Sequence, residues 1–262
     1  SYTSEHYSWD KVTTPFRGWI SDKGNQAQGQ KEIVLALNDY NSFTSVGGGG
    51  VRTSELYRAV AEWAPVVFIC FSDNDDLLVQ NPSPGIHVIC VPKTEAHKAD
   101  LLETNSFYYI AADDILAARH CSANTILFSI YQCLNIYSRV TIVEHCYMAN
   151  VPMMLGDRFI YSSHNCETRL KSQVLSGHPL GLHLNEEICA LERKTCERAT
   201  AIIAVSDEDA LEFTKLSRSC GPVITIANGA AAPHDPIEDV LESVSSEIDS
   251  ARSLVFVGSA HP

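Results

Sequence analysis

The chain has 262 residues, of which 45% are hydrophobic, and a formal net charge of −13 at pH 7. This length suits one large or two small domains and is enough to bury a substantial core. The negative charge argues against a nucleic-acid partner, which needs a basic patch, and against a strong hold on anionic lipid, so we expect neither nucleic-acid binding nor membrane association.

No targeting segment is recognisable in the sequence. No charge-free apolar run is long enough to span a membrane, and residues 1–6 show neither the basic nor the apolar region of a signal peptide. The nine cysteines include no CxxC pair and no Cys/His pairing with zinc spacing, and most of them, such as Cys70 and Cys90, lie inside apolar runs. We therefore expect a cytoplasmic protein with reduced cysteines and without structural disulfides.

The chain begins with a polar, aperiodic segment, residues 1–30, which we expect to be an N-terminal extension. Beyond it, short apolar runs predict buried strands over residues 32–37, 66–71, 86–91, 140–143, 159–162, 201–205 and 223–227. Between these runs, helices are predicted over residues 53–64, 94–102, 111–119, 124–137, 168–175 and 184–198, and after Ser206. Strands that alternate with helices predict an α/β fold with a Rossmann-like, doubly wound parallel sheet over residues 31–229.

The remaining segments are predicted from their composition. Residues 38–50, which end in four glycines, and residues 73–85, which contain two prolines, are expected to be loop and turn regions. The helix over residues 124–137 is apolar nearly all round and is therefore expected to be mostly buried. Residues 230–251 are rich in Ala, Pro, Asp, Glu and Ser and predict a linker, and residues 252–262 predict the start of a truncated C-terminal domain.

Two predicted strands end in side chains that can carry chemistry. One strand leads directly into Glu144 and His145, and another leads into His164, Asn165 and Glu167. Ligand sites of open α/β sheets form just past the carboxyl ends of strands. A histidine there can act as a general base or orient a substrate, although a histidine held in the core is an alternative interpretation. Because these residues lack a sequence-local ligand spacing, we expect no metal site.

Four consecutive glycines, Gly47 to Gly50, follow the first predicted strand and precede a helix, with Arg52 close behind. A glycine backbone can approach a ligand closely, and the N-terminus of the following helix favours an anion such as phosphate. The run matches neither GxGxxG nor a Walker A loop. A flexible structural loop is the alternative interpretation.

Several short motifs, taken in order, resemble the N-terminal half of a GT-B retaining glycosyltransferase of the glycogen-synthase-like, family-four kind. The resemblance covers about residues 31–262 and rests on Gly49-Gly50-Val51, Val143-Glu144-His145 with Pro152 after it, Tyr161 to Glu167, Ala204-Val205-Ser206, Ala227-Asn228-Gly229 and Val255-Phe256-Val257-Gly258-Ser259. It implies transfer of a sugar from a nucleotide-sugar donor, with retention, to an acceptor that is a sugar, a lipid-linked molecule or a protein. The donor is then a substrate, and no cofactor is implied.

The resemblance also implies roles for individual residues. It places the glycine run near the donor diphosphate and the acceptor, and His164 at the reacting sugar. Only the first strand of the family's second domain has a counterpart in this sequence, at residues 255–259, so the chain is expected to be the acceptor-binding part. The predicted catalytic residues are His164, His145 and Glu144, and the predicted substrate- or donor-binding residues are Gly48, Gly49, Gly50, Arg52, Asn165, Glu167 and Asn228.

Two other functions remain open on the same residues. One is a GT-B-type sugar-nucleotide epimerase, which needs an acid/base carboxylate pair at the cleft that the sequence does not locate. The other is a non-catalytic domain that binds a glycan or a protein, in which the cleft histidines can be lost without loss of binding.

Overall fold

The structure is a computed structural model that describes residues 32–45, 47–105, 112–177 and 179–229. The predicted extension (1–30), the predicted linker (230–251) and the predicted start of a second domain (252–262) lie outside the described residues. Within the described part of the chain, the elements alternate between strand and helix along most of the sequence.

The centre of the fold is an eight-stranded sheet in the order β3-β4-β2-β1-β5-β6-β7-β8. Its pairs are parallel except β3 with β4, which is antiparallel. The predicted Rossmann-like sheet is therefore confirmed, with one antiparallel strand at its edge. The strands are β1 (Ile33–Asn38), β2 (Val66–Ser72), β3 (Leu78–Ser83), β4 (Ile86–Pro92), β5 (Ser138–Glu144), β6 (Ile160–Ser162), β7 (Ala201–Ala204) and β8 (Val223–Thr225).

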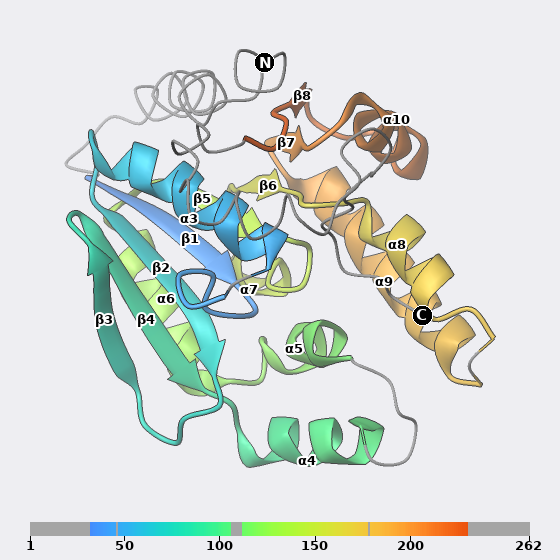
Figure 1. Ribbon diagram of the computed structural model, residues 1–262, viewed down its shortest axis with the longest axis horizontal. Helices are drawn as coiled ribbons and strands as arrows, with labels where there is room; N and C mark the ends of the chain where they lie inside the picture. The colour runs from blue at the N-terminus through green and yellow to red at the C-terminus, as the bar shows by residue number, and fades with distance from the viewer. Residues whose placement is uncertain (1–31, 46, 106–111, 178, 230–262) are drawn as a thin grey trace, which may run out of the picture.

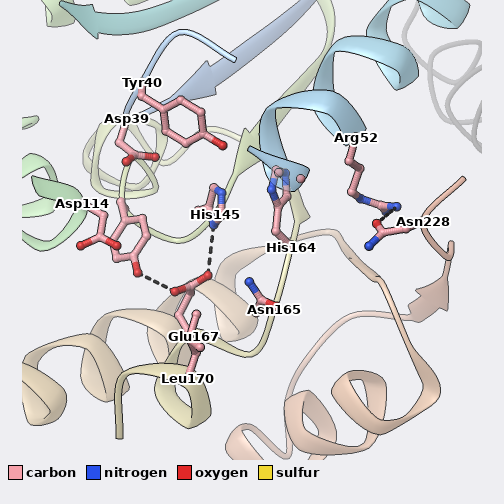
Figure 2. A pocket seen from close by; sticks show the side chains of 13 residues that line it. Asp39, Tyr40, Arg52, Asp114, His145, His164, Asn165, Glu167, Leu170 and Asn228 are labelled. Atoms are coloured by element: carbon pink, nitrogen blue, oxygen red, sulfur yellow. Dashed lines mark hydrogen bonds and ion pairs between the residues drawn. The ribbon is translucent and has the colours of Figure 1, made fainter. Parts of the chain in front are cut away.

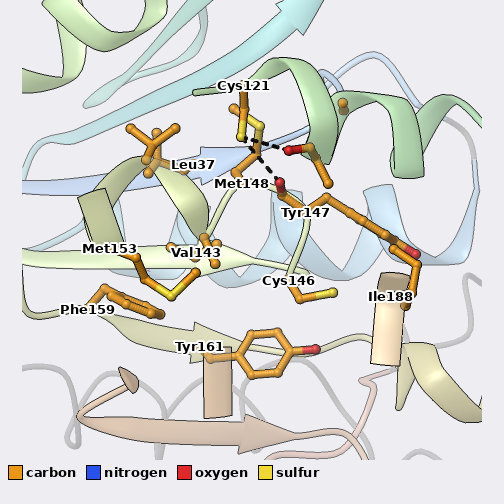
Figure 3. Close-up of a cluster of buried hydrophobic side chains, with 14 of the residues drawn as sticks. Leu37, Cys121, Val143, Cys146, Tyr147, Met148, Met153, Phe159, Tyr161 and Ile188 are labelled. Carbon is orange, nitrogen blue, oxygen red and sulfur yellow. Dashed lines mark hydrogen bonds between the residues drawn. The ribbon is translucent and has the colours of Figure 1, made fainter. Parts of the chain in front are cut away.

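Helices cover both faces of the sheet, with α3 along one face and α6 behind it (Figure 1). On β1, Val34 and Ala36 belong to the core beneath α3, whereas Leu35 and Leu37 belong to the core beneath α5, α6, α7, α9 and α10 (Figure 3). Alternate side chains of a strand face opposite sides, so β1 is buried on both. The helices are α3 (Gly48–Ala61), α4 (Glu95–Glu103), α5 (Asp113–His120), α6 (Thr125–Asn135), α7 (Asn150–Leu155), α8 (Glu167–Val174), α9 (Gly181–Arg198) and α10 (Asp207–Leu216).

Two segments predicted to be loop or turn are regular structure. Helix α3 begins at Gly48, inside the predicted loop, with Gly47 as an extended N-cap. Glycine is a poor helix former, but the first N–H groups of a helix need no intrahelical partner, so glycines are tolerated there. The residues after Gly50 stabilise the rest of the helix. The prediction of a turn over residues 73–85 is wrong because it contains β3, whose mostly exposed residues pair with β4 alone. An edge strand tolerates polar residues and proline, and the pairing register shifts between Gln80 and Ser83.

The expectation that the helix over residues 124–137 is mostly buried is also wrong. In α6 only Leu127 and Tyr131 are buried, whereas Ile126 is 46% exposed and Ile136, the C-cap, is 65% exposed. The helix packs on the sheet through one stripe, so its apolar composition does not determine its burial. The short helix α7 was not predicted at all. All nine cysteines are free, and Cys70 Sγ and Cys90 Sγ lie 3.9 Å apart on paired strands.

A buried carboxylate from α9 fixes the start of α8. Glu192 Oε1 accepts hydrogen bonds from the Glu167 N–H and the Tyr161 hydroxyl, at 2.8 Å each. Its Oε2 accepts from the Thr168 N–H at 2.8 Å and from the Thr168 hydroxyl at 2.6 Å. Burial raises the pKa of Glu192 although these hydrogen bonds lower it. Because the first N–H groups of a helix need outside acceptors, Glu192 acts as a cap supplied by the neighbouring helix.

Candidate active site

A pocket of about 350 Å³ lies at the carboxyl edge of the sheet, past the ends of β1, β5 and β6 (Figure 2). The strand register positions it, because Leu37 of β1 pairs with Val143 of β5, and β5 ends beside β6. The residues after these strands therefore emerge side by side. Of the predicted site residues, those that line the pocket are Gly48, Gly49, Arg52, His145, His164, Asn165, Glu167 and Asn228.

His164 is held through one of its two ring nitrogens. Its Nε2 lies 2.9 Å from Glu144 Oε2 and 3.0 Å from Thr53 Oγ1. Burial raises the pKa of Glu144, but the hydrogen bonds from His164 and from the Tyr57 hydroxyl, together with nearby positive charge such as that of Arg52, lower it below its usual value. An ionised carboxylate can only accept, so Nε2 carries the proton and Nδ1 keeps its lone pair. Nδ1 is buried and has no partner among the described residues.

The charge of His164 follows from its surroundings. Burial and the positive charge of His145 lower its pKa to about 4, although Glu144 raises it. The ring is therefore neutral at pH 7, and its free Nδ1 is a hydrogen-bond acceptor. Glycine is required beside it, because a Cβ at Gly49 would lie 2.8 Å from Nδ1. A Cβ at Gly48, in contrast, would meet no atom within 4 Å.

His145, in contrast to the neutral acceptor His164, is a positively charged hydrogen-bond donor. Its Nδ1 lies 3.1 Å from Glu167 Oε1, and the Tyr147 hydroxyl donates to Glu167 Oε2 at 2.6 Å. Burial lowers the pKa of His145, but the hydrogen bond and charge of Glu167, with the charges of Asp39 and Glu144, raise it to about 9. The ring is therefore an imidazolium at pH 7. Its Nε2, buried and without a partner in the described part of the chain, is a free donor.

The backbone of His145 is strained. Its φ of 58° lies in the left-handed region, which costs a residue other than glycine about 1–2 kcal/mol. The strain turns the chain out of β5, and it brings the His145 ring to 4.0 Å from the His164 ring, measured between centroids. A charged imidazolium ring and a neutral imidazole ring thus lie next to each other at the pocket wall. Such strain is typical of functional sites.

We expect the charge of His145 to make stability depend on pH. Its folded-state pKa of about 9 lies above its ordinary 6.5, so its stabilisation is complete below pH 6.5 and is lost as the pH rises through 9. The free energy of unfolding should fall across this range by roughly 1–3 kcal/mol. His145→Asn removes the titration, and asparagine tolerates positive φ. Urea unfolding of both proteins at a series of pH values should show a flatter curve for the variant, and parallel curves would contradict this assignment.

The other predicted residues have different surroundings. Arg52 donates to the carbonyl oxygens of Ile226 at 2.7 Å and Ala227 at 3.0 Å, and to Asn228 Oδ1 at 3.0 Å. It thereby ties α3 to the segment after β8 while lining the pocket. Glu144 and Gly50 do not line the pocket. Glu144 holds the Nε2 atom of His164 and is therefore a positioning residue. Gly50 instead packs against Ser45, because a Cβ at Gly50 would lie 2.6 Å from Ser45 Cβ.

Sequence reasoning missed several side chains at the pocket. Asp39 and Tyr40 follow β1, at the same edge of the sheet as His145, and Asp114 and Tyr147 complete the wall beside Glu167 (Figure 2). Asp39 Oδ1 is buried without a partner among the described residues. Burial raises the pKa of Asp39 to about 6, although His145 lowers it. The same strand-end rule that selected the histidines applies to the residues after β1.

No protein-family model matches the sequence, and no curated protein matches it significantly. Solved structures do match. The sucrose-phosphate synthase of Thermosynechococcus elongatus aligns with a TM-score of 0.55 at 13% identity, over 82% of this chain and 52% of that chain. Trehalose-6-phosphate synthase OtsA aligns with a TM-score of 0.50 at 12% identity, over 82% of this chain and 55% of that chain.

These matches concern the fold. The chain spans about half the length of the two structures, and at such low identity the likeness confirms only the architecture that the GT-B resemblance implies. The described residues contain no group of three His, Cys, Asp or Glu side chains able to hold a metal ion. None of the described helices has the length and apolar character needed to cross a membrane.

Proposed function

We propose that this chain forms the acceptor-binding part of a glycosyltransferase site, where a sugar passes with retention from a nucleotide-sugar to an acceptor. The observation that carries the proposal is the pairing of a neutral His164 with a charged His145, each with one unpartnered ring nitrogen, on two side chains that line one pocket at the strand ends. The fold shared with sucrose-phosphate and trehalose-6-phosphate synthases supports it. The nucleotide-sugar is a substrate in this proposal, and no resident cofactor is needed.

Each polar group has a chemical task in this proposal. Transfer breaks the bond between the donor's anomeric carbon and its diphosphate, which leaves with the electron pair, and forms a bond to an acceptor oxygen, whose proton passes to the departing diphosphate. His164 Nδ1 accepts a hydrogen bond from a hydroxyl of the reacting sugar. The His145 imidazolium donates from Nε2 to an oxygen that gains negative charge. The start of α3, where Gly48 is exposed and Gly49 half-buried, offers its N–H groups to the diphosphate.

The direct test is an assay of the complete gene product that contains these 262 residues. Purified protein is incubated with UDP-, GDP- and ADP-glucose and a panel of sugar acceptors, and nucleoside diphosphate release is measured. The anomeric configuration of the product is then read by NMR. Transfer with retention is the expected result. A protein that neither binds nor consumes a nucleotide-sugar would refute the proposal, and an inverted product would refute retention.

We expect Gly49→Ala to lower turnover at least tenfold. The added Cβ would lie 2.8 Å from His164 Nδ1 and 3.0 Å from the Tyr40 hydroxyl, so the ring must move, and misplacing a reacting group by about 1 Å can cost a hundredfold. Gly47→Ala is the matched control, because Gly47 does not line the pocket and its added Cβ would meet only Ser45 Oγ, at 3.7 Å. Turnover and melting temperature are measured on both variants. Equal turnover of the two would show that the close approach has no catalytic importance.

A second candidate function is sugar-nucleotide epimerisation, because the pocket does contain carboxylates. Asp39 and Asp114 both line it, and the Asp39 pKa of about 6 suits proton transfer near neutral pH. The same assay separates the two functions. An epimerase releases an altered sugar or nucleotide-sugar without any acceptor, whereas a transferase requires the acceptor for a stable product.

A further inference from the structure

A second pocket adjoins the candidate site. It has a volume of about 470 Å³ and shares Asp39 and Tyr40 with the first pocket, of about 350 Å³. Both volumes fall in the range of small-molecule sites. The second pocket extends past the ends of β2 and β4, so Asp39 and Tyr40 form a wall common to two adjoining hollows. A ligand longer than one ring can therefore occupy both.

The lining of the second pocket is polar and, among the described residues, offers no free cation. Asn41 Nδ2 donates to Gln80 Oε1 at 3.0 Å, and the Asn74 side chain donates to Ser72 Oγ at 3.0 Å. Its cation, Lys93, is paired with Asp73 at 2.6 Å. Amides and hydroxyls of this kind bind neutral hydroxyl groups as both donors and acceptors.

The Asp39 side of the first pocket is unfavourable for an anion. Its acidic side chains are Asp39, Asp114 and Glu167. Of its cations among the described residues, Arg52 is engaged by the oxygens of residues 226–228, and His145 is paired with Glu167 through Nδ1 and keeps only Nε2 free. The unpaired Asp39 Oδ1 accepts only from a donor, such as a sugar hydroxyl. A phosphate beside Asp39 would be repelled by that carboxylate and by Asp114 and Glu167, and the nearby cation, His145, is already paired with Glu167.

We propose that the acceptor is an uncharged oligosaccharide, whose reacting unit lies in the first pocket against Asp39 and whose next unit lies in the second pocket against Asn41 and Gln80. This inference rests on the proposed function and names its acceptor class. The two solved relatives are named as synthases of phosphorylated sugars, so the proposal predicts a different acceptor for this chain.

Binding to the 262-residue chain without any donor tests the proposal. Maltose, cellobiose and lactose are compared by titration calorimetry and saturation-transfer NMR with glucose, galactose and glucose 6-phosphate. At least one neutral disaccharide should bind tenfold or more tightly than its component monosaccharides, and glucose 6-phosphate should bind more weakly than glucose. Preferred binding of glucose 6-phosphate, or no gain from the second sugar unit with any disaccharide, would overturn the proposal.

Single substitutions test which sugar unit of the disaccharide lies in which pocket. Asn41→Ala should reduce disaccharide affinity about tenfold and leave monosaccharide affinity unchanged. Asp39→Asn should weaken both. Asn81→Ala, on β3 outside the pocket lining, is the control and should change neither. Equal effects of Asn41→Ala and Asn81→Ala would contradict the second unit's placement. Disaccharide binding without transfer from any donor would refute the proposed function alone, and transfer only to phosphorylated monosaccharides would refute this inference alone.

Discussion

His164→Ala should cut turnover of the complete gene product by about a hundredfold or more, the scale of a positioned acid–base or orienting group. This loss corresponds to about 2.7 kcal/mol of transition-state stabilisation. The physical reason is the loss of Nδ1, the unpartnered acceptor of a pocket-lining ring, next to Gly49. Steady-state kinetics with a nucleotide-sugar and an acceptor, together with the melting temperature, measure both consequences.

His164→Gln separates catalysis from stability. The ring nitrogen Nε2 also holds the fully buried Glu144, so alanine leaves that carboxylate with fewer partners and costs stability. A glutamine amide can replace Nε2 as the donor to Glu144 but has no atom in the place of Nδ1. We expect the glutamine variant to be more stable than the alanine variant and equally impaired in turnover. A destabilised but active His164→Ala would instead identify a core histidine and refute this role.

Glu192→Ala should lower the free energy of unfolding by about 3–5 kcal/mol, the scale of an unpaired buried polar network. It removes the acceptor of the Glu167 and Thr168 N–H groups, the Thr168 hydroxyl and the Tyr161 hydroxyl, all at the buried start of α8. Because α8 begins at Glu167, the partner of His145, the pocket should lose its order as well. Urea unfolding at pH 7 gives the stability directly.

Glu186→Ala is the matched control for this substitution. It removes the same type of side chain from the same helix, α9, at an exposed position, where substitutions usually change stability by no more than about 0.5 kcal/mol. A Glu192→Ala variant as stable as Glu186→Ala would show that α8 needs no cap from α9.

The parallel core of the sheet could be predicted because its strands are buried on both faces and therefore read as unbroken apolar runs. The edge strand β3 could not, since it is polar, contains Pro82 and pairs on one side only. The start of α3 was hidden for a related reason. Its glycines carry no helix preference, and the helix is stabilised there by the packing of later residues such as Leu56 and Tyr57.

The candidate site was predictable where a rule about strand ends applied. That rule placed His145 and His164 on one edge, and the register of β1, β5 and β6 brings them together. It could not supply protonation states, which depend on the contacts of each ring nitrogen with Glu144 or Glu167. The capping role of Glu192 could not be predicted, because the sequence shows it only as one of several charged residues of a helix. The tertiary structure alone shows that it is buried.

The guanidinium of Arg52 makes a mechanical link across the domain. It donates hydrogen bonds to the carbonyl oxygens of Ile226 and Ala227. Its own helix, α3, also contains Gly49 and Thr53, which both contact the His164 ring. A pull on the chain beyond β8 would therefore be transmitted, through one side chain and less than one turn of helix, to the imidazole at the pocket wall. A displacement of the segment after β8 is therefore expected to shift the His164 ring, and Arg52 is the side chain that couples the two.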